Sequence, residues 1–133
     1  MTSMMTVRTL QRSLALVFFV LGGWCLFAPT SVLALTIRPE YQSDAPLVPV
    51  LIAAFGAQAL LAGLFAAFSR FERVTFLAYG VALLPFFVFD YWAYAVVPLL
   101  TPLGLLDVVG NVMMLIVCVM GYRLAGSQIP ATR

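Results

Sequence analysis

The chain alternates between long apolar segments and short segments that carry most of its charges. Residues 13–37 and 45–69 contain no charged side chain, and a third apolar segment runs from Val74 to Val97 with Asp90 as its single charge. A fourth segment covers residues 103–124, with Asp107 near its start and Arg123 near its end. Because a helix needs about 20 apolar residues to cross the hydrocarbon core of a bilayer, the pattern predicts four transmembrane helices.

We expect these helices at about 13–36, 46–69, 73–97 and 102–124, forming one all-α, four-helix membrane domain over residues 1–133. Within the first range, Pro29 should end the transmembrane helix, because proline removes a hydrogen bond and clashes with the preceding turn. Thr30 and Ser31 would then cap a short segment lying near the membrane surface. Pro85 is expected to kink the third helix.

The amino-acid composition also indicates that the chain is embedded in a membrane. Of its 133 residues, 64% are hydrophobic and only 9% are charged, whereas ordinary soluble domains carry roughly 25% charged residues. A globule of this size cannot hide so much apolar surface from water. The composition therefore excludes a soluble enzyme, a disordered chain and a nucleic-acid binder, and makes the lipid bilayer the first expected partner.

The arginines predict the orientation. Excess positive charge marks the cytoplasmic loops of membrane proteins. With four helices, one side receives six of the seven arginines, and only Arg38 falls on the other side; the six are Arg8, Arg12, Arg70, Arg73, Arg123 and Arg133. We expect both termini in the cytoplasm, with the chain in a bacterial inner (plasma) membrane. A cleaved signal peptide ending at Val32-Leu33-Ala34 is the alternative interpretation of the first helix.

The sequence lacks residues that several kinds of catalysis and metal binding require. The chain has no histidine, which removes the commonest metal ligand and general base, and it has no lysine for Schiff-base chemistry. Cys25 and Cys118 are expected at different depths, too far apart for a disulfide, and are interpreted as free thiols. We predict no catalytic residues and no metal site, and the sequence identifies no cofactor.

Small residues gather on one face of the second helix. Gly56, Ala59, Gly63 and Ala67 share that face, and in lipid such residues allow close helix contact. We interpret helix 46–69 as the central packing helix of the bundle. The alternative is that this face joins two copies in a homodimer.

The candidate site is a group of polar side chains expected near the outer side. Asp90, Asp107 and Asn111 fall at similar depths on a helical hairpin, counted at 1.5 Å per residue. Ionisable groups inside a bilayer usually face a partner or a water-filled cavity. Tyr91, Trp92 and Tyr94 follow Asp90 and would surround it with aromatic rings, while Gln58 is the polar side chain nearest mid-membrane; the predicted ligand-binding residues are these seven.

Two interpretations of this group stay open. In the first, it forms an outward-opening aromatic pocket with an acidic floor, which could hold a proton, bind a cation or hydrogen-bond the polar head of a lipophilic ligand. In the second, the Tyr and Trp rings form an interfacial belt, and Asp90 is held by Asn111, Tyr94 or Arg38 for structural reasons alone.

The overall plan resembles the DoxX-like group of small four-helix membrane proteins. The resemblance lies in a first helix ending Gly-Gly-Trp-Cys-Leu-Phe-Ala-Pro (22–29) and in a small-residue second helix, Phe-Gly-Ala-Gln-Ala-Leu-Leu-Ala-Gly-Leu-Phe (55–65). It implies a four-helix membrane fold and a role as a subunit of a membrane redox system or as an accessory protein. It carries over no catalytic residue.

Three functions follow as hypotheses. The leading one is a non-enzymatic membrane protein, either an accessory subunit of a larger membrane complex or a binder of a lipid or other hydrophobic small molecule. The second is a proton-coupled small-molecule transporter acting as a homodimer. The third is a membrane isomerase acting on a lipid, with Asp90 and Asp107 as acid and base.

Overall fold

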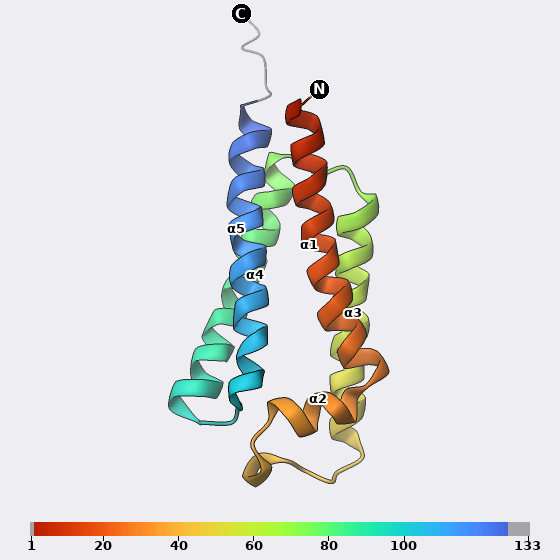
Figure 1. Ribbon diagram of the computed structural model, residues 1–133, viewed down its shortest axis with the longest axis vertical. Coiled ribbons are helices and arrows are strands. Elements are labelled where there is room, and N and C mark those ends of the chain that lie inside the picture. Colours follow the sequence, from red (N-terminus) through yellow and green to blue (C-terminus); the bar gives the residue numbers. More distant parts are fainter. Residues whose placement is uncertain (1, 128–133) are drawn as a thin grey trace, which may run out of the picture.

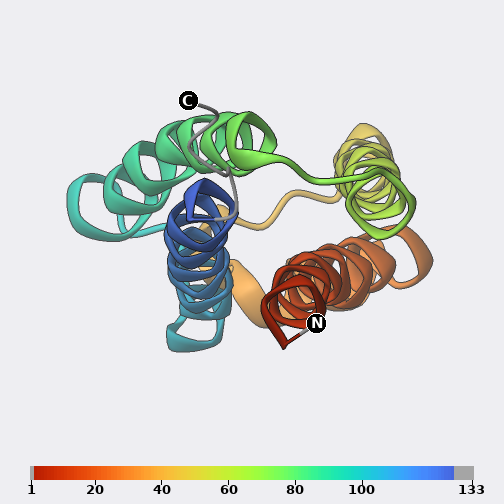
Figure 2. The ribbon, with the colours of Figure 1, turned by 90° about the horizontal axis from the view of Figure 1, so that it is seen from above.

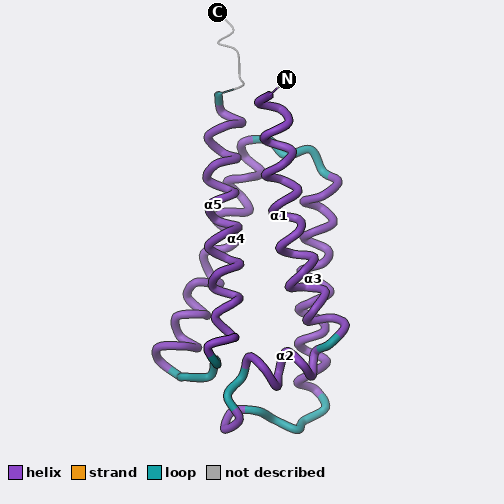
Figure 3. The backbone as a smooth tube through the Cα atoms, in the orientation of Figure 1, coloured by secondary structure: helices purple, strands orange, loops and turns teal. Residues whose placement is uncertain are grey.

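The computed structural model describes residues 2–127 and consists of helices joined by short connections (Figures 1 and 3). Four helical segments, 6–27, 47–68, 73–96 and 102–126, are long and apolar enough to cross a membrane, which confirms the predicted number. The predicted charge at Arg133 lies outside the described residues. The elements are α1 (Thr2–Phe27), α2 (Pro29–Thr36), η1 (Pro39–Tyr41), α3 (Leu47–Phe68), α4 (Arg73–Tyr91), η2 (Trp92–Val96), η3 (Pro102–Leu105) and α5 (Leu106–Gly126).

The first predicted helix is two helices. α1 begins at Thr2, well before residue 13, and ends at Phe27; Ala28 then leaves helical geometry with φ −139° and ψ 54°. Pro29 opens α2 at its first position, where its missing N–H costs no hydrogen bond. The expected caps are wrong, because Thr30 and Ser31 lie inside α2 and no side chain caps its N-terminus. Ser31 Oγ instead accepts a hydrogen bond from Trp24 Nε1 at 3.3 Å.

The third and fourth predicted helices change their winding near the same end of the bundle. α4 continues past the internal Pro85 to Tyr91 and then widens into the π-helical turn η2. The chain before α5 makes a 3-10 turn, η3, with Thr101 Oγ1 accepting from the N–H of Gly104 at 3.2 Å. Pro98 follows the end of η2, where a helix cannot continue without the N–H that proline lacks. Pro102 opens η3, where that missing N–H costs no hydrogen bond.

The four long helices pack in the order α3, α1, α5, α4 (Figure 2). α1 contacts both α3 and α5, and α4 contacts α5. The interpretation of helix 46–69 as the central helix is therefore wrong: α3 lies at one edge and α1 in the middle. α3 and α4 follow one another in sequence, yet in Figure 2 they lie apart, joined by the connection that crosses between them.

Glycines and one glutamine explain the close contacts. A Cβ on Gly22 of α1 would lie 2.8 Å from Cβ of Ala59 on α3, so α1 and α3 meet almost backbone to backbone there. Gln11 donates from Nε2 to the carbonyl oxygens of Ala66 (2.7 Å) and Ser69 (2.5 Å), which satisfies the last turn of α3. The buried apolar core comprises Leu14, Ala15, Ala66, Phe71, Phe76, Leu83, Met114 and Cys118.

α2 crosses the end of the bundle opposite the two termini (Figure 1). Hydrogen bonds tie it and the following residues to the connection between α4 and α5. Thr101 donates from its N–H to Thr36 O at 2.9 Å and from Oγ1 to Leu35 O at 2.6 Å. Arg38 donates from its N–H to Leu99 O at 2.8 Å and from Nε to Leu100 O at 3.1 Å. This end of the bundle is called the α2 end below.

Candidate functional site

Two carboxylates share one amide between α4 and α5. Asn111 Nδ2 donates to Oδ2 of Asp90 and to Oδ2 of Asp107, each at 3.1 Å. The structure therefore brings these three predicted site residues together at one level, and the two acceptor oxygens lie no more than about 6 Å apart. Asp107 and Asn111 meet because they are four residues apart on one helix, whereas Asp90 reaches Asn111 through the packing of α4 on α5.

Two of the three members of this acid–amide–acid group are buried, and Asp107 is half-buried. Asn111 is 3% exposed and Asp90 is 9% exposed. Buried charges are expensive unless they are paired or hydrogen-bonded, and here the amide supplies a donor to each acid. Arg38, which the sequence offered as a partner for Asp90, instead donates to the carbonyl oxygen of Leu100. Among residues 2–127, no arginine bonds to either acid of the group, whose acceptor oxygens lie in an apolar setting.

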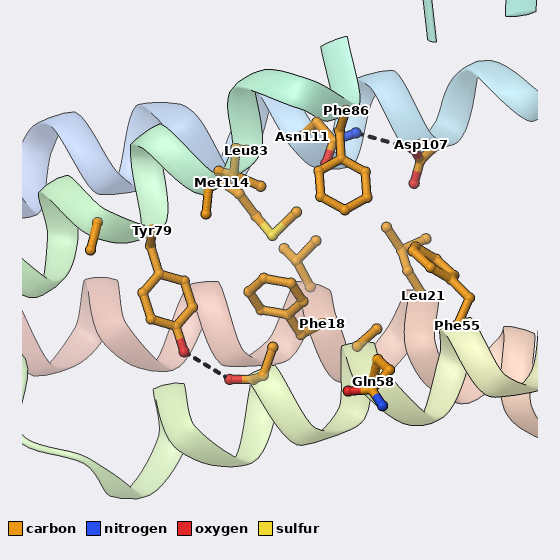
Figure 4. Close-up of a pocket in the computed structure, with 15 residues that line it drawn as sticks. Phe18, Leu21, Phe55, Gln58, Tyr79, Leu83, Phe86, Asp107, Asn111 and Met114 are labelled. Carbon is orange, nitrogen blue, oxygen red and sulfur yellow. Dashed lines mark hydrogen bonds between the residues drawn. The ribbon is translucent and has the colours of Figure 1, made fainter. Parts of the chain in front are cut away.

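Asp107 and Asn111 of the acid–amide–acid group lie at the wall of a cavity of about 460 Å³, here called the inner cavity (Figure 4). All four long helices line it, and the polar contributors are Gln58, Tyr79, Asp107 and Asn111. Its volume falls within the range of sites that hold small organic ligands. Among its apolar lining residues are Phe18, Leu21, Phe55, Leu83, Phe86 and Met114.

A second cavity of about 400 Å³, the outer cavity, lies between the inner cavity and α2. Val32 and Thr36 of α2 line it, together with Trp24, Asp90 and Leu100. Leu21, Phe55 and Asp107 line both cavities and so stand between them. The acid–amide–acid group therefore faces both cavities, with Asp90 on the outer side and Asn111 on the inner side.

The predicted aromatic shell is not where the sequence suggested. Tyr91, Trp92 and Tyr94 are 68%, 50% and 42% exposed, and they line neither cavity. Tyr91 and Trp92 follow the inward-pointing Asp90 by one and two residues, so helical geometry turns them away from it. Their exposure matches the alternative interpretation, an aromatic belt at the membrane surface.

Other aromatic residues take their place around the inner cavity. Phe18, Phe55, Tyr79 and Phe86 come from three helices and converge on it (Figure 4). Sequence reasoning missed them because an aromatic residue in an apolar helix looks the same whether it faces lipid, core or cavity. Gln58 lines the inner cavity, and a polar residue in an otherwise apolar helix was the signal that singled it out.

The described residues offer hydrogen-bond acceptors but no assembled metal site. Among residues 2–127, no three His, Cys, Asp or Glu side chains gather closely enough to hold a metal ion. Both cysteines are free thiols, as predicted. The site can accept hydrogen bonds or a positive charge at its acidic end, and it can enclose an apolar group along the rest of its length.

Comparison of the chain with protein-family models, with curated proteins and with solved structures gives no match. The class is therefore defined by the structure itself. The chain is an all-helical protein with four helices able to cross a membrane and a cavity between them.

Proposed function

We propose that this chain is an integral protein of a bacterial inner membrane with both termini in the cytoplasm. The support is the distribution of arginine. Arg8, Arg12, Arg70, Arg73 and Arg123 belong to the end of the bundle opposite α2, while Arg38 follows α2. Under the positive-inside rule, the α2 end faces outward. The outer cavity then lies in the outer half of the bilayer, and the inner cavity extends from it toward Tyr79, near the cytoplasmic end of α4.

We further propose that the protein binds a lipophilic molecule without transforming it. One observation carries this proposal: an apolar cavity of about 460 Å³ is lined at one end by the half-buried Asp107 and the buried Asn111, whose amide also donates to the buried Asp90. Binding sites for small molecules have this character, an apolar lining with a few convergent polar groups. The protein would act as a ligand-binding protein or an accessory subunit, and the resemblance to the DoxX-like group implies the accessory role.

The chemistry of the polar end selects the ligand class. Two carboxyl groups around one amide favour a head group that donates hydrogen bonds or carries a positive charge. The inner cavity favours a chain or ring system without polar atoms. We therefore propose an amphiphile with an amine or hydroxyl head, the head at Asp90, Asp107 and Asn111 and the apolar part toward Tyr79.

Tryptophan fluorescence tests this proposal. Trp24 lines the outer cavity, and Trp92→Phe leaves it as the single tryptophan of the chain. In phospholipid nanodiscs, dodecylamine with a nitroxide on its chain should quench Trp24 saturably. Asp90→Asn and Asp107→Asn should each weaken binding about tenfold, as expected for loss of a charge-assisted hydrogen bond.

Asp44→Asn provides the matched control, because it removes the same charge at the α2 end from an exposed loop that lines neither cavity. It should leave the quenching curve unchanged. Quenching that rises linearly with dodecylamine, equally in all variants, would show partition into the bilayer and would refute the binding proposal.

The shared amide supports a second candidate function, proton transfer on a bound lipid. Asp90 and Asp107 lie close enough together to contact one substrate, one as acid and the other as base. An isomerase would move a C–H proton through one carboxyl group, so lipid incubated with the protein in D₂O should gain deuterium. Deuterium uptake that disappears in Asp107→Asn would establish the isomerase. If the wild-type protein binds saturably and the lipid gains no deuterium, the protein binds the lipid without transforming it.

A further inference from the structure

One side of the bundle is open where its neighbours are closed. α3 packs on α1 and α2, whereas α4 packs on α5 (Figure 2). Residues 55–62 of α3 and 78–86 of α4 face each other across the inner cavity, and this side is called the α3–α4 opening below. Two side-chain interactions cross it: Tyr79 donates its hydroxyl to Ala62 O at 3.1 Å, and the rings of Phe55 and Phe86 lie 6.2 Å apart.

Small side chains keep this side open. Ala59 and Ala62 of α3 line the inner cavity opposite Ala78 and Ala82 of α4. Alanine methyl groups cannot fill the space between two helices that are held apart by α1 and α5. The opening is therefore narrowed by the larger rings of Phe55 and Phe86, near the level of Asp107 and Asn111 (Figure 4).

The other routes into the inner cavity are more strongly closed. At the α2 end, the backbone and side-chain hydrogen bonds of Thr101 and Arg38 would have to break before α2 could lift. At the opposite end, the buried residues Leu14, Phe71 and Phe76 are packed against one another in the core. The α3–α4 opening is crossed by one side-chain hydrogen bond, from Tyr79 to Ala62 O, and by the ring pair Phe55–Phe86, and no backbone hydrogen bond joins α3 to α4 among the described residues.

We propose that the lipophilic ligand enters the inner cavity sideways from the bilayer, through the α3–α4 opening, and that the Phe55–Phe86 pair is its gate. This inference rests on the proposed ligand-binding function and adds the route and the gating residues. An amphiphile concentrates in the bilayer, where its chain already lies beside these helices. Ring rotation then admits the chain while the head slides to the acidic end at the same level.

Binding kinetics test the gate. Stopped-flow mixing of nanodiscs carrying the Trp92→Phe protein with vesicles carrying nitroxide dodecylamine reports the rate of quenching of Trp24. Phe55→Ala and Phe86→Ala should each raise the association rate constant by about threefold or more, because the gate no longer has to open. If only the dissociation rate rises, the two rings are cavity wall and the gate is refuted.

Phe65→Ala is the matched control for these variants. Phe65 lies on α3, is 59% exposed and lines neither cavity. Its truncation removes the same ring from α3, the helix that carries Phe55, and should leave the association rate unchanged. An equal acceleration in this control would assign the effect to general loosening of α3 and would overturn the proposal.

A lock at the α2 end tests the alternative route. Ile37 and Leu100 form an isolated antiparallel bridge, a geometry that accepts a disulfide. In a Cys25→Ser/Cys118→Ser background, Ile37→Cys/Leu100→Cys can be compared reduced and oxidised. Oxidation should leave the association rate unchanged, whereas a tenfold decrease would show that the ligand enters beneath α2.

Two further outcomes separate this inference from its foundation. If the wild-type protein shows no saturable quenching, both the binding function and the gate are refuted. Saturable binding whose association rate is unchanged in Phe55→Ala and Phe86→Ala would refute the gate alone. In the same serine background, a disulfide between two copies of Phe86→Cys would show that a second chain covers the opening, and would also overturn lateral entry.

Discussion

The contact between α1 and α3 and the opening between α3 and α4 both use small residues of the same helix, with opposite results. On the α1 side, the backbone of α1 lies against Gly56. A Cβ built on Gly56 would clash with the carbonyl oxygen of Gly22 and the backbone nitrogen of Leu26. On the α4 side, Ala62 lines the inner cavity, opposite Ala78 and Ala82 of α4. A small residue thus permits close helix contact, but the order of the helices in the bundle decides whether another helix packs against it.

The largest expected effect comes from breaking the closed contact. Gly56→Ala places a methyl group against the backbone of α1, which cannot move aside as a side chain can. We expect a loss of about 3 kcal/mol in the free energy of unfolding, measured by reversible unfolding in mixed detergent micelles.

Gly23→Ala is the control for that loss. Nothing lies within 4 Å of a Cβ built on Gly23, although this residue is the neighbour of Gly22 in the same helix. It should keep wild-type stability or gain slightly, because alanine favours helix over glycine. Equal destabilisation by both variants would contradict the close contact of α1 with α3.

An intermediate effect is expected from filling the open side. Ala82→Leu adds three carbons facing the inner cavity and should weaken binding of nitroxide dodecylamine about tenfold. The free energy of unfolding should change by less than about 0.5 kcal/mol, because the added carbons occupy the inner cavity and displace no other side chain. Val81→Leu, on the exposed face of α4, should change neither quantity. A stability loss in Ala82→Leu above about 2 kcal/mol would indicate a packed contact there.

The smallest effect is expected from the bond that crosses the opening. Tyr79→Phe removes the hydroxyl that donates to Ala62 O and should cost about 0.6 kcal/mol, the usual size for a side-chain hydrogen bond within a membrane. Tyr91→Phe, an exposed tyrosine of the same helix, should cost nothing measurable by the same unfolding assay. A cost several times larger for Tyr79 would mean that α3 and α4 depend on each other for stability.

The candidate site was partly predictable. Asp90, Asp107 and Asn111 were expected at one level, and the structure joins them through two hydrogen bonds. The prediction worked because the rise per residue and the hairpin connection fix depth along the helix axis. It failed for Tyr91, Trp92 and Tyr94, because the direction of a side chain depends on the rotation of its helix about the axis, which depth does not constrain. For Trp92 and Tyr94 it also depends on the π-helical winding of η2, where they lie.

The sequence by itself determined the solvent, the number of long helices and the depth of the polar groups, because hydropathy, proline positions and helical rise are properties of consecutive residues. Only the tertiary structure decided that α1 lies between α3 and α5, that Phe18, Phe55 and Phe86 surround a cavity, and that α3 stands apart from α4. In an all-apolar bundle every helix face is nearly equivalent in hydropathy, so side-chain shape across the contacts selects the neighbours. That selection becomes visible only when all four helices are in place.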